Sequence, residues 1–109
     1  GLVQSLKNEV VALDPFARAN LVQPGWTVTH MARPALEVPG NIAGALRTMP
    51  LRQLARAKDI ARAVVLLASP AASRHVSGET LTVAGGMEGR VQWSGGDVGE
   101  AAVRARARD

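Results

Sequence analysis

The arrangement that most constrains this chain is a helix-like segment between two short strand-like segments. In residues 59–68 the apolar side chains recur at the spacing of one helical face, and Asp59 stands in the first turn, where a carboxylate favours the helix dipole. Residues 16–22 and 79–83 have the length and composition of strands, and two turn signals, Pro24-Gly25 and Gly85-Gly86, follow them. A strand, a helix and a second strand predict one βαβ unit with parallel strands.

A further helix is expected before this unit. Leu2, Leu6 and Val10 recur every four residues, and Asp14-Pro15 then ends the pattern. Two parallel strands make a poor free-standing domain, since parallel sheets need helices on both faces and neighbouring strands at both edges. The chain of 109 residues also starts at Gly1, inside the expected helix. We therefore expect an α/β fragment that belongs to a larger parallel sheet.

Two other segments lack the regular pattern of the βαβ unit. Residues 27–50 are short apolar pieces interrupted by prolines and glycines, and we expect a long connection with one or two short helices, of the kind that often forms a lid. Residues 87–109 contain several glycines and then an end rich in alanine and arginine. They predict either a tail that follows the surface and has a short terminal helix, or disorder. The chain thus divides into a domain at 1–86 and a tail at 87–109.

Composition excludes several classes of protein. The absence of cysteine removes disulfides, thiolate metal sites and cysteine nucleophiles. No apolar run approaches the ~20 residues that span a bilayer, and no secretory signal begins the chain, so we expect a cytoplasmic protein with no membrane partner. The net charge of +4 depends partly on Arg104, Arg106 and Arg108. With two tryptophans, one phenylalanine and no tyrosine there is no ladder of rings for stacking bases, and no nucleic-acid partner is expected.

Three segments in order carry a family pattern. The first is residues 18–29 with the Pro-Gly turn; the second is 49–54, leading to 59–61 and 66–69; the third is 77–86 with its final glycines. Gly1-Leu2 also matches what commonly follows a Tyr-x-x-x-Lys motif on the same helix. Each motif alone is common, but their order and spacing over residues 1–86 resemble the carboxyl-terminal half of the short-chain dehydrogenase/reductase family.

The resemblance implies a Rossmann-type, doubly wound parallel sheet, to which this chain supplies a helix, a strand, a lid, a helix and a strand. It also implies hydride transfer between the nicotinamide of NAD or NADP and a carbonyl or alcohol carbon of a small molecule, in a homo-oligomer. The tyrosine, lysine and serine that perform the family's chemistry, and its glycine-rich turn for the pyrophosphate, cannot be placed here. No catalytic residue is assigned, and the chain alone is expected to be inactive.

The Pro24-Gly25 turn is the expected cofactor contact. It follows a strand at its carboxyl end, where ligands bind in open α/β sheets, and glycine lets the backbone approach a flat ring closely. By position in the family, the backbone of Thr27 and the hydroxyl of Thr29 are implied to meet the nicotinamide carboxamide, which has both a donor and an acceptor. The alternative is an ordinary turn that ends a strand.

Three residues at the start of the expected lid, Trp26, His30 and Met31, are candidates for substrate binding, because ligand pockets are mostly apolar with a few polar groups. Trp26 fits a packing role equally well, and a lone loop histidine such as His30 is more often solvated. His75 is expected to be structural. No histidines and carboxylates have the spacing of metal ligands, so no metal site is expected.

Some positions bear on packing and assembly. Asn20 is expected to make a structural hydrogen bond, and Ala84 replaces an aspartate that is frequent in the family. The helix at 59–68 and the strand at 79–83 resemble elements that pack across a subunit interface in family tetramers. The alternative is that their apolar faces only fill the core.

Functions of different classes therefore remain open. The first is a portion of an NAD(P)-dependent oxidoreductase that supplies the nicotinamide-side turn, the substrate lid and elements for oligomer contacts. The second is a non-catalytic binding or assembly module that keeps the last βαβ unit, motivated by the missing catalytic residues. A third, nucleic-acid binding through the terminal arginines, depends on those three residues alone.

Overall fold

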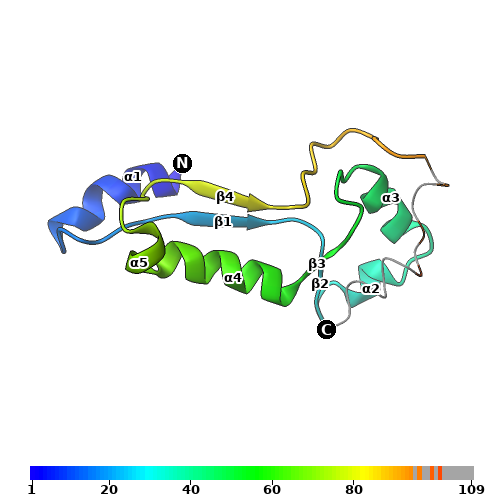
Figure 1. The fold of residues 1–109 in the computed structure, drawn as a ribbon, viewed down its shortest axis with the longest axis horizontal. Coiled ribbons are helices and arrows are strands. Elements are labelled where there is room, and N and C mark those ends of the chain that lie inside the picture. Colours follow the sequence, from blue (N-terminus) through cyan, green and yellow to red (C-terminus); the bar gives the residue numbers. More distant parts are fainter. Residues whose placement is uncertain (95, 97–98, 100, 102–109) are drawn as a thin grey trace.

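The computed structural model describes residues 1–94, 96, 99 and 101, so the terminal arginines lie outside the described residues. The elements follow the predicted order of helix, strand, connection, helix and strand (Figure 1). They are α1 (Leu2–Glu9), the 3-10 helix η1 (Val10–Ala12), β1 (Leu21–Pro24), β2 (Thr27–Val28), α2 (Arg33–Leu36), α3 (Asn41–Arg47), β3 (Ala55–Arg56), α4 (Ala57–Ala68), α5 (Pro70–Ser73) and β4 (Thr80–Val83). Within the described residues, no helix is both long and apolar enough to span a membrane.

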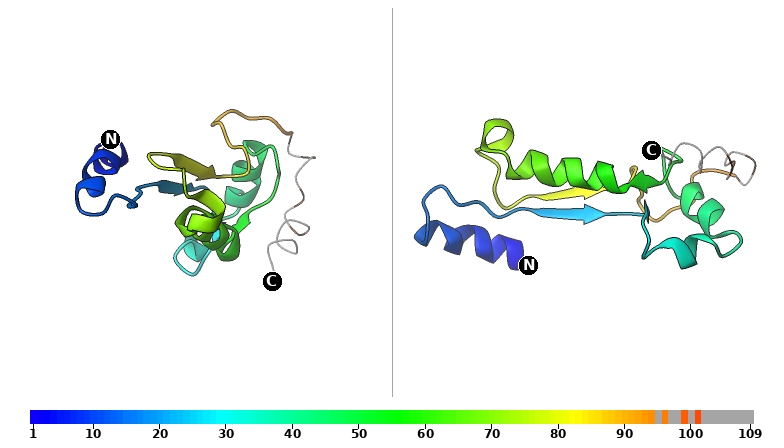
Figure 2. Two further views of the ribbon diagram at one scale, coloured as in Figure 1. Left: turned by 60° about the vertical axis from the view of Figure 1, so that its left-hand side comes forward. Right: turned by 90° about the horizontal axis from the view of Figure 1, so that it is seen from below.

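Strands β1 and β4 form the parallel pair that the sequence predicts, with Leu21 opposite Thr80 and Pro24 opposite Val83. Helix α4 connects them and packs on one side of the pair, while α1 lies on the other side (Figures 1 and 2). The parallel pair tolerates Pro24, which has no N–H, because the Val83 carbonyl accepts a hydrogen bond from Gly25, the next residue. The N–H of Gly25 donates to the Val83 carbonyl at 2.9 Å, so no proline N–H is required.

Strand β1 begins at Leu21 rather than at Phe16, where the sequence pattern starts. The cause is visible at Asn20, whose side-chain amide donates to the Val76 carbonyl at 3.0 Å and accepts the Glu79 N–H at 3.1 Å. These side-chain bonds connect the segment before β1 to the loop before β4. They take the place of the backbone hydrogen bonds that would extend the strand. Asn20 thus has the structural hydrogen bonds that we expected.

Helix α4 begins at Ala57, earlier than the predicted start at Asp59. The Asp59 carboxylate reaches back to Arg56, accepting its backbone N–H at 2.8 Å and its guanidinium at 3.0 Å. The bond from the Arg56 N–H to the Asp59 side chain is one of the two bonds of a capping box. It gives this N–H a partner, which the backbone at the start of a helix does not provide. The carboxylate predicted for the helix dipole therefore also fixes where the helix begins.

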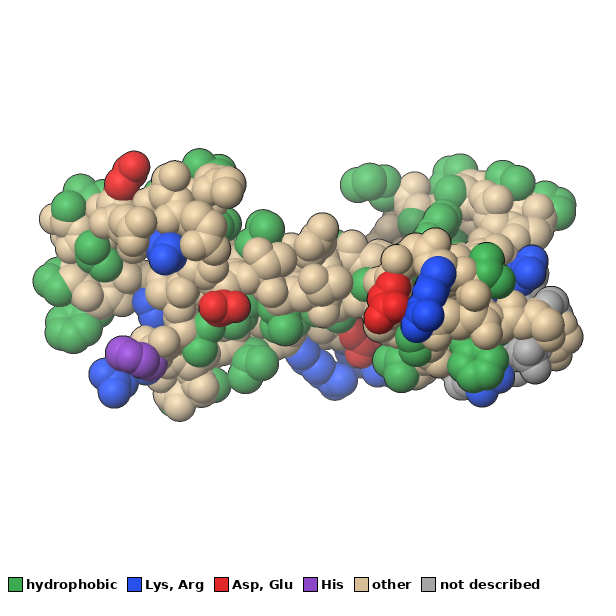
Figure 3. Space-filling model, turned by 90° about the horizontal axis from the view of Figure 1, so that it is seen from above, with side chains coloured by type: hydrophobic (Ala, Val, Ile, Leu, Met, Phe, Trp, Pro, Cys, Tyr) green, Lys and Arg blue, Asp and Glu red, His purple; other side chains and the backbone are tan. Residues whose placement is uncertain are grey.

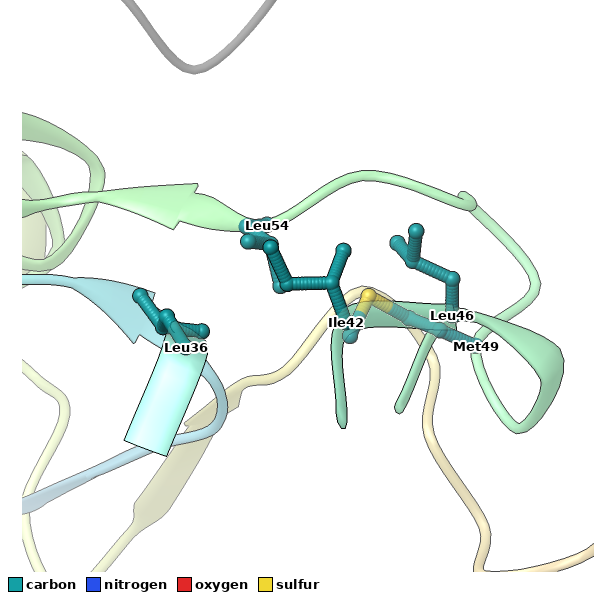
Figure 4. Close-up of a cluster of buried hydrophobic side chains, with 5 residues drawn as sticks. All are labelled: Leu36, Ile42, Leu46, Met49 and Leu54. Carbon is teal, nitrogen blue, oxygen red and sulfur yellow. The ribbon is translucent and has the colours of Figure 1, made fainter. Parts of the chain in front are cut away.

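Residues 26–56 form a small lobe beyond the carboxyl ends of β1 and β4, and they include the connection predicted at 27–50. The lobe holds α2, α3 and the short parallel pair of β2 and β3. The main hydrophobic cluster of the described residues lies here, and its members are at most 6% exposed (Figure 4). They are Leu36, Ile42, Leu46, Met49 and Leu54.

The strand unit, residues 1–25 and 57–86, is much less covered. Neither α1 nor α4 contains a buried residue, and large apolar side chains such as Leu2 and Val65 are 79% and 66% exposed. Figure 3 shows hydrophobic side chains spread over the end of the molecule that carries α1. The radius of gyration is 16.9 Å, against ~13 Å for a compact domain of about 100 residues.

Candidate functional site

The carboxyl ends of β1 and β4 meet the small lobe at a cleft of about 510 Å³, which we call the turn cleft. The cleft is shallow and open to solvent over most of its boundary. Its volume is within the range of roughly 300–1,000 Å³ found for ligand pockets. The cleft is lined by Pro24, Gly25, Trp26, Thr27, Thr29, Ala32 and Met87. All four residues predicted as cofactor contacts, together with Trp26, therefore lie around one space.

Gly25 is required by the neighbouring strand end. A Cβ at this position would lie 2.7 Å from the Cβ and 2.9 Å from the Cα of Ala84, and side-chain atoms do not approach backbone so closely. The absence of a side chain lets the two strand ends converge, and the Gly25 N–H donates to Val83 across the gap. These contacts fix the turn against the end of β4, beside the cleft. Ala84, where the family often has aspartate, provides the contact.

The two threonines present polar groups at the cleft in different ways. In the β2–β3 pair Ala55 donates its N–H to the Trp26 carbonyl at 3.0 Å, and alternation in a parallel ladder turns the backbone of Thr27 toward the opposite edge of β2. The Thr27 hydroxyl donates to the Gly25 carbonyl at 3.0 Å. The Thr29 hydroxyl accepts the Ala32 N–H at 3.1 Å, so this bond does not use its own proton.

The three predicted substrate residues are placed differently. Trp26 is half-buried, lines the turn cleft and packs against the hydrophobic cluster of the small lobe. His30 and Met31 are exposed just before α2, Met31 at 90%, and neither belongs to the described lining of the turn cleft. The structure thus groups Trp26 with the threonines and leaves His30 and Met31 outside.

A second cleft, of about 390 Å³, lies between the small lobe, the start of α4 and the end of β4. Its charged residues are Arg56 and Asp59, which form an ion pair at 3.0 Å. The hydrogen bond from the Arg56 side chain, followed by the one from its backbone N–H, lowers the pKa of Asp59 from 3.8 to about 2. The aspartate is therefore ionised at neutral pH and held in its capping position. No group of three or more potential metal ligands occurs among the residues that the structure describes.

Two lining residues of the turn cleft were missed from the sequence. Ala32 enters through the turn before α2, and its small apolar side chain carries no signal of a site. Met87 follows the Gly85-Gly86 end of β4. A signal for it did exist, because the carboxyl ends of parallel strands share one edge of a sheet, so residues just beyond β1 and β4 are expected to meet.

Comparison with known proteins gives a consistent picture. A family model described as enoyl-(acyl carrier protein) reductase matches residues 1–88. The chain is 40% identical over 87 residues to 3-oxoacyl-[acyl-carrier-protein] reductase FabG of Salmonella typhimurium, covering 80% of this chain and 34% of that protein. It is 36% identical over 91 residues to short-chain dehydrogenase/reductase SDRA of Arabidopsis thaliana, covering 84% and 34%.

Solved structures show the same likeness. A hydroxysteroid dehydrogenase from Escherichia coli matches with a TM-score of 0.70 at 34% identity, over 79% of this chain and 34% of that one. A 7α-hydroxysteroid dehydrogenase complexed with NADH and 7-oxo glycochenodeoxycholic acid matches with a TM-score of 0.70 at 32% identity, over 83% and 34%. The chain thus spans about a third of the length of the relatives it matches.

Proposed function

Because this chain belongs to the short-chain dehydrogenase/reductase family, we propose that it forms the carboxyl-terminal part of an NAD(P)-dependent oxidoreductase. The reaction would transfer a hydride between nicotinamide and a carbonyl or alcohol carbon of a small molecule. The observation that carries the proposal is the turn cleft, where Pro24, Gly25, Thr27 and Thr29 gather beside the ends of two parallel strands. Ligands bind at this position in open α/β sheets.

The lining of the turn cleft fits one side of a nicotinamide. The ring is flat, and Trp26 and Met87 give the cleft apolar surface. The carboxamide needs a donor and an acceptor, which the outward-facing backbone of Thr27 and the hydroxyl of Thr29 would provide. When bound, NAD or NADP supplies or accepts the hydride. The residues of this chain would orient the ring and exclude water from one face.

The remaining groups of the reaction would come from other parts of a longer protein. The sequence contains no tyrosine, so the family's acid–base tyrosine has no counterpart here. The uncovered faces of α1 and α4 support this proposal, because parallel sheets are normally covered on both sides. The pyrophosphate-binding turn and the choice between NAD and NADP would be supplied by the same additional residues.

Substrate binding and assembly are proposed for the outer surfaces. Residues 27–50 would act as the substrate lid, with Trp26 inside the cleft and His30 and Met31 facing the solvent until a substrate or a conformational change brings them in. The exposed Val65 on α4 supports a homo-oligomer in the complete protein, with the apolar surface covered by a second subunit. We expect such a protein in the cytoplasm.

Titration with NADH and with NADPH tests the proposal. We would measure nicotinamide binding to the complete protein that carries this chain, and to its Thr29→Val and Thr29→Ser variants. The valine removes the hydroxyl at nearly constant volume and should weaken binding about tenfold, the equivalent of one hydrogen bond of about 1.4 kcal/mol, whereas the serine should retain it. If the unsubstituted protein bound neither cofactor, the oxidoreductase proposal would be abandoned in favour of the assembly module.

A further inference from the structure

The segment after β4 continues beyond the end of the strand toward α3 (Figure 1), and the family match ends at residue 88, inside this segment. We call residues 87–94 the strap. It starts where Gly85 and Gly86 adopt positive φ angles of 63° and 84°, close against the side chains of Met49 and Pro50. Side chains at these glycines would be strained and would collide with Met49 and Pro50, so the two glycines suit this bend of the chain. Figure 1 shows the strap leaving β4 and running toward α3.

The far end of the strap caps helix α3. The last carbonyls of a helix have no partner within the helix, and here the Arg47 carbonyl accepts the N–H groups of Gln92 at 2.6 Å and of Trp93 at 3.1 Å. The Arg47 guanidinium returns a bond from its Nε to the Trp93 carbonyl at 3.1 Å. The strap therefore satisfies the carboxyl end of α3 from a distant part of the chain.

The side chain of Trp93 adds a second attachment. Its indole Nε1–H donates to the Met49 carbonyl at 3.0 Å, just beyond α3, and its ring packs against the hydrophobic cluster of the small lobe. The guanidinium carbon of Arg52 lies 4.1 Å from the ring centroid, which is a cation–π contact. Arg52 has a φ of 46°, an uncommon conformation for a residue other than glycine. Trp93 thus contacts the chain just after α3 twice, at Met49 through its indole N–H and at Arg52 through its ring.

The near end of the strap belongs to the turn cleft, because Met87 lines it together with Thr27 and Thr29. We propose that the strap is a latch, in which Trp93 fixes α3 and the small lobe while Met87 forms part of the wall of the turn cleft. Trp93 is then a positioning residue for the site, acting through α3 and the strap backbone. The effect on the cleft rests on the proposed function, whereas the latch itself does not.

Hydrogen exchange in the complete protein tests the latch without any cofactor. Replacing Trp93 by alanine removes the indole hydrogen bond, the ring packing and the cation–π contact, and we expect the amides of residues 41–47 to exchange at least about tenfold faster. Trp93→Phe, which keeps an aromatic ring but not the N–H, should restore most of the protection. The matched control is Val91→Ala in the same strap, where the side chain is 63% exposed, and it should leave exchange unchanged.

The outcomes separate the latch from the proposed function. Faster exchange confined to α3 and its surroundings, with weaker binding of NADH or NADPH, would support the proposal. Unchanged exchange in α3, or an equal increase in α1 and α4, would overturn it, because Trp93 would then be either dispensable or a general stabiliser. A third outcome is weaker protection of α3 in the Trp93→Ala variant while even the unsubstituted protein binds no nicotinamide cofactor. This result would support the latch and overturn the oxidoreductase proposal.

Discussion

The small lobe and the strand unit differ in how completely their apolar side chains are buried within this chain. In the lobe, Ile42, Leu46 and Met49 are at most 1% exposed, enclosed by short helices and by the strap. In the strand unit, Val65 on α4 is 66% exposed, and Phe16, in the turn before β1, is 86% exposed. The region with the weaker sequence pattern thus has the better-formed core.

The difference teaches what a regular pattern of apolar residues means. A periodic pattern such as that of α4 predicts a helix with one apolar face. It does not identify the part of the protein that covers this face. Parallel strands and their helices bury most of their surface within a larger sheet, and here neither α1 nor α4 contains a buried residue. The short pieces of residues 27–50 instead fold around one another. The comparison therefore predicts different responses to mutation in the two regions.

Leu46→Ala should have the largest effect, because Leu46 is fully enclosed in the small lobe. Removing a buried leucine side chain costs about 2–5 kcal/mol, and hydrogen exchange of the α3 amides in this chain would report the loss. The matched substitution is Val65→Ala on α4, which should change the protection of its own helix by about 0.5 kcal/mol or less. Equal costs in the two regions would break the comparison.

Gly25→Ala should have the next largest effect, since Gly25 joins the two regions. The added Cβ meets the backbone of Ala84 at 2.9 Å, and overpacking of this kind costs about 1–3 kcal/mol. Within α3 the matched change Gly44→Ala meets nothing within 4 Å and should stabilise by about 0.5–1 kcal/mol through helix propensity. Urea midpoints that move in opposite directions would sharpen the comparison. A shift of both in the same direction would contradict it.

The strand unit was predictable from the sequence because its elements are periodic and end at turn residues. The pattern predicted the parallel βαβ arrangement and the turns at Pro24-Gly25 and Gly85-Gly86. In the structure this arrangement places Pro24 and Gly25 beside the end of β4. The start of β1 did not follow, because Asn20 bonds to loop atoms whose position depends on the folded structure. Local patterns thus give the elements, and tertiary hydrogen bonds adjust their ends.

The small lobe and its site were harder to predict. The two-residue strands β2 and β3 are too short to show alternation, and Trp93 is fastened mainly through backbone carbonyls, which leave no trace in the sequence. The glycine content of the tail predicted either a segment that follows the surface or disorder, and it gave no sign that residues 87–94 would cap α3. Thr27 and Thr29 were placed by resemblance to a family, and periodicity alone would not have singled them out. The contribution of Ala32 emerged only from the folded structure, whereas that of Met87 could have been inferred from its position just beyond β4.

The smallest expected effect is a pH dependence confined to the strand unit. The folded-state pKa of Asp59, about 2, is below its ordinary value of 3.8, so the ionised carboxylate stabilises the start of α4. This contribution is complete above about pH 4 and is lost as the pH falls toward about 2. Helix α3 has no acidic residue in its sequence NIAGALR and should not follow this curve. Amide exchange at residues 57–60, corrected for intrinsic rates, would measure the difference between the two helices.

Two variants decide whether the capping aspartate causes that pH dependence. Asp59→Asn removes the titrating group and should flatten the acid dependence of α4, at the cost of weaker protection at neutral pH. Glu88→Gln removes an exposed carboxylate that pairs with Arg90 at 3.2 Å in the strap, far in sequence from α4, and should leave the curve unchanged. Constant protection of α4 down to about pH 2 in the unsubstituted chain would show that the Arg56–Asp59 pair does not hold the helix start.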